Sequence, residues 1–222
     1  MLKNVTHFGA FQTAIDLYQI YKKGSPAMQK QATFTAMTDG TPADYAIIGK
    51  ANGEHAKALA DRILDHLALL KGDTGGFAID RYRHCLQTAT RAYRDGRDNE
   101  YVVCALLHDI GDTLASANHA DLAATMLEPF VSKENYWIVK HHGIFQGYYF
   151  FEHLGLDKNM RDEYRDSKYW HACAEFCAKY DQNSFDPDYE DMPIEEFIPM
   201  VKEVFMRPKS SIYKKRGKEE IF

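Results

Sequence analysis

Histidine and aspartate side chains recur in the middle of the chain at places where helices are expected to begin or end. They are His84, His108 with Asp109, His119, His141 or His142, and Asp181. Imidazole and carboxylate groups together suit borderline divalent ions such as iron, zinc and manganese. Helix ends can direct these groups into a shared cavity without disturbing the packed middles of the helices. The pattern therefore indicates a metal site assembled from several helices.

The pair His108-Asp109 carries the strongest signal because it follows an apolar run, Val102 to Leu107, that is expected to be buried. A buried carboxylate without a partner costs several kcal/mol. A salt bridge is one solution, but a metal is favoured because it offsets that cost directly and the two oxygens of one aspartate can bridge two ions. Asp181 falls on the inward side of its expected helix, so its carboxylate also requires a cation.

The other candidates have ordinary interpretations beside the metal one. On a helical wheel His84 lies with polar residues, opposite the apolar stripe, on a face that is usually solvated. His119, in a first helical turn, can be an ordinary exposed histidine. Periodicity alone does not choose between His141 and His142, one of which can act only by orienting other groups. The acidic loop Asp181 to Asp191 lacks the glycine that a calcium loop requires at its sixth position, which argues against a calcium site.

Apolar residues spaced three and four apart dominate the sequence and predict an all-α fold. Thr41, Asn118, Ser132 and Ser167 are expected to cap helices, and Gly111 and Gly143 to end them. The expected helices are Phe11 to Lys22, Pro42 towards Leu70, Asp80 to Tyr93, Glu100 to Ile110, His119 to Leu127, Lys133 to His142, and Lys168 to Tyr180.

The length of 222 residues and the 45% hydrophobic content fit one sizeable core with an N-terminal extension. We expect residues 1–70 to form a helical extension packed on the core, residues 71–206 the metal-binding domain, and residues 207–222 a tail. The sequence makes no prediction of the function of residues 1–70 or of the oligomeric state.

A formal net charge of -5 and the lack of a long basic stripe argue against nucleic-acid binding. The absence of a long apolar stretch and of a signal peptide predicts a cytoplasmic protein without a membrane partner. The four cysteines lack the paired spacing of a zinc knuckle and are expected to be reduced core residues. These are Cys85, Cys104, Cys173 and Cys177.

The ordered set of histidines and aspartates resembles the HD-domain superfamily of metal-dependent phosphohydrolases and oxygenases, over about Gly75 to Tyr189. Three stretches resemble its oxygenase branch, the mixed-valent diiron enzymes that include myo-inositol oxygenase and the phosphonate-cleaving HD oxygenases. They are His84 to Ala89, His142 to Phe145, and Glu175 to Asp181. The resemblance implies an HD-domain helical bundle, selects His142 over His141, and makes Asp181 the closing ligand.

The resemblance further implies a dinuclear Fe(II)/Fe(III) centre with Asp109 as the bridging ligand. His84, His108 and Asp181 would be the other protein ligands of one iron. His119 and His142 would hold the second iron, where Asp109 and His142 serve catalysis at open positions. O2 and a small substrate, either a polyol or an anion such as a hydroxyphosphonate, would meet there, and a C-P or C-C bond would be cleaved. The alternative is a phosphohydrolase that uses manganese, cobalt or zinc on a phosphate ester or a nucleotide.

Candidates for binding a substrate anion are Arg161, Arg165 and Lys168, although a charged surface turn is an equally ordinary interpretation of these residues. In inositol oxygenase a lysine that contacts substrate follows the HD-x-G turn, whereas this chain has Asp112, which argues against inositol itself. Phe77 and the glycines beside it are candidates for a gate.

Overall fold

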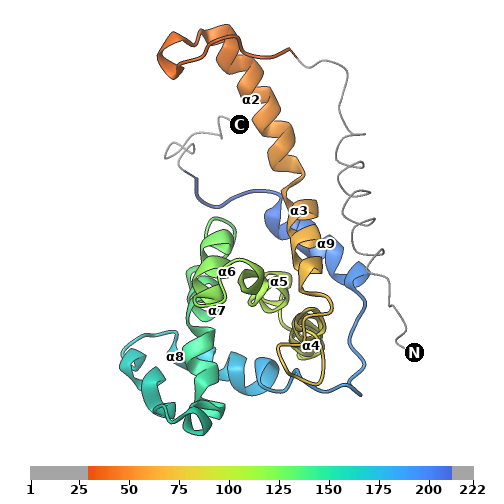
Figure 1. The fold of residues 1–222 in the computed structure, drawn as a ribbon, viewed down its shortest axis with the longest axis vertical. Helices are drawn as coiled ribbons and strands as arrows, with labels where there is room; N and C mark the ends of the chain where they lie inside the picture. Colours follow the sequence, from red (N-terminus) through yellow and green to blue (C-terminus); the bar gives the residue numbers. More distant parts are fainter. Residues whose placement is uncertain (1–29, 212–222) are drawn as a thin grey trace, which may run out of the picture. The chain divides into compact units, whose positions relative to one another are not determined.

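The computed structural model describes residues 30–211, and these residues form helices and turns without a strand (Figure 1). The predicted all-α fold is confirmed for this part of the chain. The chain divides into two compact units, one ending at Gly53 and the other beginning at Glu54. This boundary falls inside helix α2 (Pro42–Lys57). The helix expected over Phe11 to Lys22 lies outside the described residues.

Helix α2 begins where the sequence predicted. The hydroxyl oxygen of Thr41 accepts a hydrogen bond from the backbone N–H of Asp44 (3.3 Å), and the carboxylate of Asp44 accepts one from the backbone N–H of Thr41 (3.0 Å). This reciprocal arrangement satisfies two backbone donors that a helix start leaves free. The single helix predicted from Pro42 towards Leu70 is wrong, because the backbone departs from helical geometry at Ala58 before α3 (Leu59–Leu67) begins.

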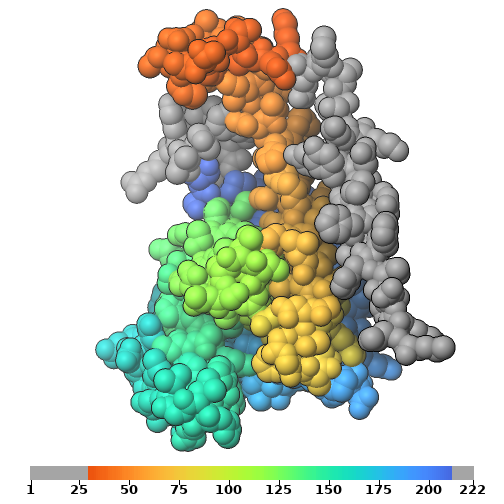
Figure 2. All heavy atoms as spheres, in the orientation of Figure 1, coloured from red at the N-terminus to blue at the C-terminus, as the bar shows by residue number. Residues whose placement is uncertain are grey.

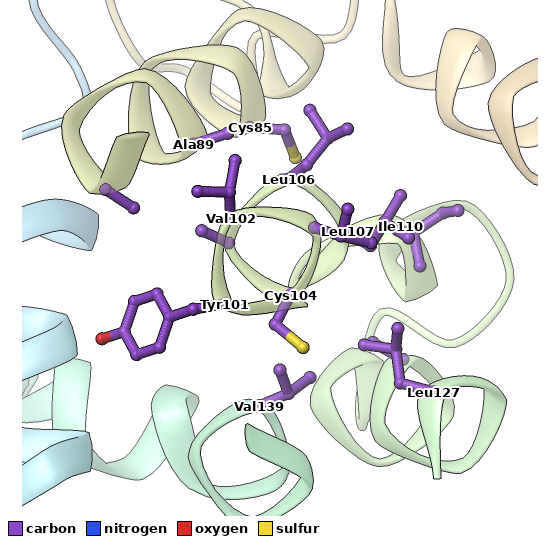
Figure 3. Close-up of a cluster of buried hydrophobic side chains, with 14 of the residues drawn as sticks. Cys85, Ala89, Tyr101, Val102, Cys104, Leu106, Leu107, Ile110, Leu127 and Val139 are labelled. Carbon is purple, nitrogen blue, oxygen red and sulfur yellow. The ribbon is translucent and has the colours of Figure 1, made fainter. Parts of the chain in front are cut away.

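The second unit is built from α3 and six further helices in its described part. They are α4 (Arg81–Arg94), α5 (Asn99–Leu107), α6 (His119–Leu127), α7 (Lys133–Gln146), α8 (Trp170–Phe176) and α9 (Ile194–Phe205). Helix α5 forms the centre of the core, since every residue from Tyr101 to Leu107 is buried. Figure 3 shows its side chains pointing outward in several directions, towards Cys85 of α4 and towards Val139 and Leu127. Helices α4, α7 and α9 pack against it.

Helix α9 is not among the helices predicted from the sequence. Phe197, Val201 and Phe205 recur at intervals of four and are buried in the core. Pro199 lies inside the helix, and a proline within a helical pattern usually indicates a break. Packing against α3 and α5 supports the helix despite the lost backbone donor. The amphipathic spacing was therefore the better guide to this segment than the proline.

Helix α7 is capped by Ser132 as predicted, through a 3.1 Å hydrogen bond from the backbone N–H of Asn135. The predicted stop at Gly143 is wrong, because the helix continues to Gln146 and buries Phe145 in the core. Three 3₁₀ turns follow: η4 (Gly147–Tyr149), η5 (Phe151–Leu154) and η6 (Lys158–Tyr164). This segment lies at the surface of the second unit, coloured teal in Figure 2.

Helix α8 begins at Trp170, two residues later than predicted, and changes at its end into a π-helical turn, η7 (Cys177–Asp181). The backbone N–H of Gln182 donates to the carbonyl of Cys177, five residues earlier (3.1 Å). Because a π turn is wider than an α turn, it changes the direction of the side chains that follow it. Both Tyr180 and Asp181 are buried as a result.

None of the described helices has the length and apolar character that crossing a membrane would require. The four cysteines are free thiols in buried positions, as the sequence predicted. Burial raises the pKa of the Cys85, Cys104 and Cys177 thiols well above the ordinary value. These thiols therefore remain protonated and pack as small apolar groups.

Candidate metal centre

Five helical segments deliver imidazole and carboxylate groups to one place in the second unit. His84 comes from α4, His108 and Asp109 from the end of α5, His119 from the first position of α6, His142 from α7, and Asp181 from the π turn. His108 is fully buried, and His84, His142 and Asp181 are nearly so. The structure thus brings together all six residues that the sequence analysis selected as metal ligands.

The carboxylate of Asp109 lies between two pairs of histidines. Its Oδ2 atom is 3.5 Å from Nε2 of His84 and 3.5 Å from Nε2 of His108. Its Oδ1 atom is 3.3 Å from Nε2 of His119 and 3.1 Å from Nε2 of His142. One carboxylate thus presents a different oxygen to each pair, which is the arrangement that a ligand shared by two ions requires.

Asp181 joins only the first of these pairs. Its Oδ1 atom lies 3.2 Å from Nε2 of His84 and 3.6 Å from Nε2 of His108. The side chain of Gln146 donates a hydrogen bond to the same oxygen (3.2 Å). The other carboxylate oxygen of Asp181 is buried and has no hydrogen-bond partner in the structure. A buried carboxylate oxygen without a donor is costly, and a cation would satisfy it.

Three of the imidazole rings are anchored to backbone carbonyls through Nδ1. His84 donates to Ser184 (2.8 Å), His108 to Ala105 (2.8 Å) and His142 to Val139 (2.7 Å). Since a carbonyl oxygen can only accept, Nδ1 of these neutral rings carries the proton. Each Nε2 then presents its lone pair to the cluster, which is the form of histidine that binds metals.

The spacing of the Nε2 atoms fits metal coordination. Nε2 of His84 lies 3.1 Å from Nε2 of His108, and Nε2 of His119 lies 3.2 Å from Nε2 of His142. Two nitrogens bound at right angles to an ion, each about 2.0–2.1 Å from it, would be about 3.0 Å apart. Two lone pairs facing each other at this distance repel unless a cation lies between them. The groups present therefore fit two metal ions, one for each pair of histidines.

The charges of the cluster are strongly coupled. Burial alone would raise the pKa of the Asp109 carboxyl, but in the metal-free chain protonation of His108 and His142, with a hydrogen bond from protonated His142, holds it well below its ordinary value. Burial opposes protonation of His84 and His108, yet the Asp109 and Asp181 carboxylates raise the pKa of both rings. Burial lowers the pKa of His119. The two aspartates thus remain ionised and available to a cation.

A cavity of about 470 Å³ opens over the cluster and is lined by Asp109, His119, His142 and Asp181. Much of its remaining wall is apolar or aromatic. These side chains are Phe77, Ile79, Tyr149, Phe150 and Phe185. Phe185 stacks on the ring of His84 with centroids 4.4 Å apart, and Phe77 stacks on Phe185 at 4.6 Å. The cavity can therefore receive a small molecule directly beside the imidazole and carboxylate groups.

The interpretation of the His84 side of α4 as a solvated face is wrong. Gln87 and Thr88 on this side are fully buried because the loop after the π turn covers them. The side-chain amide of Gln87 donates to the carbonyl of Asp186 (2.6 Å) and accepts from its backbone N–H (3.3 Å). A polar helix face can be buried when a loop supplies backbone partners of this kind.

His141 lies outside the cluster. Its ring stacks on Trp137 with centroids 4.0 Å apart, and its Nδ1 atom donates to the Trp137 carbonyl (2.9 Å). Burial lowers the pKa of His141. The choice between the two adjacent histidines, which periodicity left open, is made by the position of His142 in the cluster.

The three basic residues expected to bind a substrate anion do not line the cavity. The guanidinium of Arg161 lies 3.6 Å from the centroid of the Tyr148 ring, and that of Arg165 lies 4.0 Å from the Trp170 ring and pairs with Asp162 (3.1 Å). The amine of Lys168 lies over Tyr169. They form a cationic and aromatic surface cluster, which agrees with the ordinary interpretation of a charged turn.

Gln146 and Arg81 also line the cavity, and neither was predicted from the sequence. Gln146 lies one helical turn after His142, so its position would have been predicted had α7 been extended beyond Gly143. Arg81 contacts Asp112, a contact across 31 positions of sequence for which the sequence contains no local signal.

Residues 81–171 match the family model of the HD domain. The matched segment contains His84, His108, Asp109, His119 and His142, whereas Asp181 follows it. No curated protein matches the chain. The match agrees with the resemblance found in the sequence and supports the HD-domain superfamily, without separating its oxygenases from its phosphohydrolases.

Proposed function

We propose that this chain, which carries an HD domain with a clustered set of metal-binding side chains, is a diiron oxygenase. The family match and the His/Asp cluster together support a metal-dependent HD enzyme. The proposal adds the number of ions, their identity and the reaction. The enzyme would use O2 to cleave a C-P or C-C bond of a small hydroxylated, anionic substrate such as a hydroxyphosphonate.

One observation supports a dinuclear site above all others: the two oxygens of Asp109 face different histidine pairs. A site for a single ion would need only one of these oxygens. His84, His108 and Asp181 would hold the first iron together with Asp109. His119 and His142 would hold the second iron, which would have fewer protein ligands than the first and would be accessible from the cavity. Open coordination positions are where a substrate can bind a catalytic metal.

The electrostatics of the cavity favour an anionic group at the metals. The ions, when bound, supply the redox chemistry with O2 and the positive charge that attracts an oxyanion. When the ions are bound, the imidazoles would be neutral ligands, because Nδ1 keeps its proton on a carbonyl oxygen in three of them and Nε2 must be deprotonated to bind an ion. Two aspartates then leave an excess of positive charge on two ions of total charge about five. A phosphonate or carboxylate would neutralise this excess.

The described walls of the cavity carry aromatic rings and no unpaired lysine or arginine. Phe77, Tyr149, Phe150 and Phe185 present rings around the metal-binding groups. A wall of this kind suits a small substrate better than a large, highly charged one. Among the residues that line the described cavity, Arg81 is the one lysine or arginine, and Asp112 and Asp73 pair with it. No basic side chain of this wall is therefore free to bind the several phosphates of a nucleotide.

The decisive experiment is metal analysis of the unmodified protein, with low-temperature EPR after partial oxidation under limited O2. Two irons per chain and a coupled half-integer-spin signal are expected. O2 consumption should then be measured with hydroxyphosphonates and polyols. Two metals that give no such signal in any redox state, with turnover of phosphate esters by the manganese, cobalt or zinc form, would contradict the oxygenase proposal and support hydrolysis.

The matched variants are Asp109→Ala and Asp121→Ala. Asp109→Ala removes the shared carboxylate and is expected to abolish dinuclear binding. Asp121 is an exposed carboxylate on α6 that pairs with Lys140 at 3.0 Å, so its removal should leave metal content at two. Two metals per chain in the Asp109→Ala protein would contradict the bridging role.

A further inference from the structure

The four histidines of the cluster are not anchored in the same way. His108 and His142 each donate from Nδ1 to the carbonyl three residues earlier in the chain, at Ala105 and Val139. His119 is the first residue of α6, so no preceding helical turn provides such a carbonyl. Its Nδ1 atom instead lies 3.3 Å from Oδ1 of Asp112. His119 is thus the one cluster histidine whose Nδ1 faces a carboxylate.

Asp112 is itself held in place. Its side chain is only 8% exposed, and its Oδ2 atom pairs with Nη1 of Arg81, which leaves Oδ1 directed at His119. The Nε atom of Arg81 pairs with Asp73 (3.2 Å). A β-carbon at Gly75 would lie 2.7 Å from Nη2 of Arg81, so the bare glycine leaves room for the guanidinium. The contacts with Asp73 and Asp112 therefore fix the position of Arg81, which in turn orients Asp112.

We propose that Asp112 is a positioning residue for His119. By accepting the Nδ1 proton of the ring, it leaves the Nε2 lone pair for the second metal, between His142 and Asp109. A carboxylate acceptor also makes the imidazole a more basic ligand than a carbonyl acceptor does. Asp112 thereby sets the affinity of the second metal. Arg81 acts through Asp112 and does not bind substrate.

This inference rests on the proposed dinuclear site, and it is specific to one half of it. The first metal would be held by rings that are anchored to Ser184 and Ala105, neither of which contacts Asp112. Loss of the Asp112 carboxylate should consequently separate the two metal affinities. If the role of Asp112 were merely structural, its substitution would lower the affinity of both metals.

The test is an anaerobic titration of the metal-free protein with Fe(II), and in parallel with Zn(II), against a competing chelator. In Asp112→Ala the second metal is expected to bind about 10–100-fold more weakly, the usual effect of losing an outer partner of a ligand, while the first is unchanged. Asp112→Asn retains an acceptor oxygen and should recover part of this loss. Arg81→Gln frees Asp112 and should give a smaller weakening. Asp121→Asn on α6 is the charge-matched control and should bind both metals normally.

A second measurement reports the Nδ1 proton directly. Nitrogen-15 NMR of the zinc-bound protein should show a slowly exchanging proton on Nδ1 of His119 in the unmodified chain, and faster exchange of this proton in Asp112→Ala. Thermal unfolding of the metal-free variants establishes that they fold. Two normal affinities in Asp112→Ala, or equal weakening of both metals, would overturn the inference and leave the dinuclear site intact. Fewer than two metals in the unmodified protein would overturn the proposed function as well.

Discussion

His141 and His142 are adjacent in sequence, yet their rings have different surroundings. Nε2 of His142 points at Asp109, whereas the ring of His141 stacks on Trp137 and approaches Tyr164. We therefore predict that His142→Asn loses the second metal, because one of its two histidines is gone, and that His141→Asn retains both metals. Metal content per chain after dialysis is the measurement. Two metals in the His142→Asn protein would contradict the assignment.

Gly111, in the turn after His108-Asp109, allows a close approach between two backbones. A β-carbon there would lie 2.3 Å from the carbonyl oxygen of His119. Gly111→Ala should push the start of α6 away and cost about 1–3 kcal/mol of the free energy of unfolding, as overpacking does. Because His119 lies at the start of α6, this displacement should also abolish binding of the second metal. Thermal unfolding and metal analysis would detect both effects.

Gly143 is the matched control for this substitution. A β-carbon at Gly143 would meet nothing nearer than Nε2 of His119 at 3.9 Å, which is an ordinary contact. Because Gly143 lies inside α7, alanine there should add about 0.5–1 kcal/mol of stability. If both alanine variants were equally destabilised, the close approach at Gly111 would not be the cause.

Between secondary-structure elements, Arg83 of α4 holds in place the loop that covers the polar side of that helix. Its guanidinium donates three hydrogen bonds of 2.9 Å, to the carboxylate of Asp191 and to the carbonyls of Pro187 and Tyr189. Because the same loop supplies the Ser184 carbonyl to His84, Arg83→Ala should loosen the loop and weaken the first metal. Hydrogen exchange of the backbone amides from Ser184 to Asp191 should become faster.

Arg94→Ala is the control for the loop. Arg94 lies on the same helix, but its contact with the loop is a cation–π approach of 5.2 Å to the centroid of the Tyr189 ring. Exchange in the loop and the affinity of the first metal should change little in this variant. Unchanged exchange in Arg83→Ala would show that the loop is held by other contacts.

Some elements with local signals were predictable from the sequence, although the side-chain caps predicted at Asn118 and Ser167 are wrong, and elements that depend on distant contacts were not. The caps at Thr41 and Ser132 use side chains within three residues, and both are confirmed. The extension of α7 beyond Gly143 depends on the burial of Phe145, and α9 on packing against α3 and α5. Local propensity is a weak guide where such tertiary contacts decide the outcome.

The residues of the candidate site also differ in whether a local signal or a distant contact determines their position. His108-Asp109 could be selected because a carboxylate at the end of a buried run is costly by itself. The burial of His84 depends on a contact between Gln87 and Asp186, 99 positions apart, which no local pattern encodes. The contact of Arg81 with Asp112 was missed for the same reason.

Across the molecule, the two proposed metals would link helices that lie far apart in the sequence. One metal that binds only the folded state at 100 times its dissociation constant adds about 2.7 kcal/mol of stability, so two add about 5.4 kcal/mol. For a chain of this size such a gain corresponds to roughly 10–20 °C in the unfolding midpoint. We therefore predict that the unfolding midpoint falls by about this amount when a chelator removes the metals. Differential scanning calorimetry of Asp109→Ala, whose midpoint should respond less to chelator than that of the unmodified protein, is the control.

The hydrogen bond from His84 to Ser184 spans 100 positions of the chain. A ribosome adding roughly 5–20 residues per second needs on the order of 5–20 s to make that length. Once His142 has been added, the nascent chain carries the four histidines and Asp109, but for a further few seconds it lacks Asp181 and the carbonyl that orients the first ring. The complete set of groups proposed for the first metal would therefore form only after Ser184 has been synthesised.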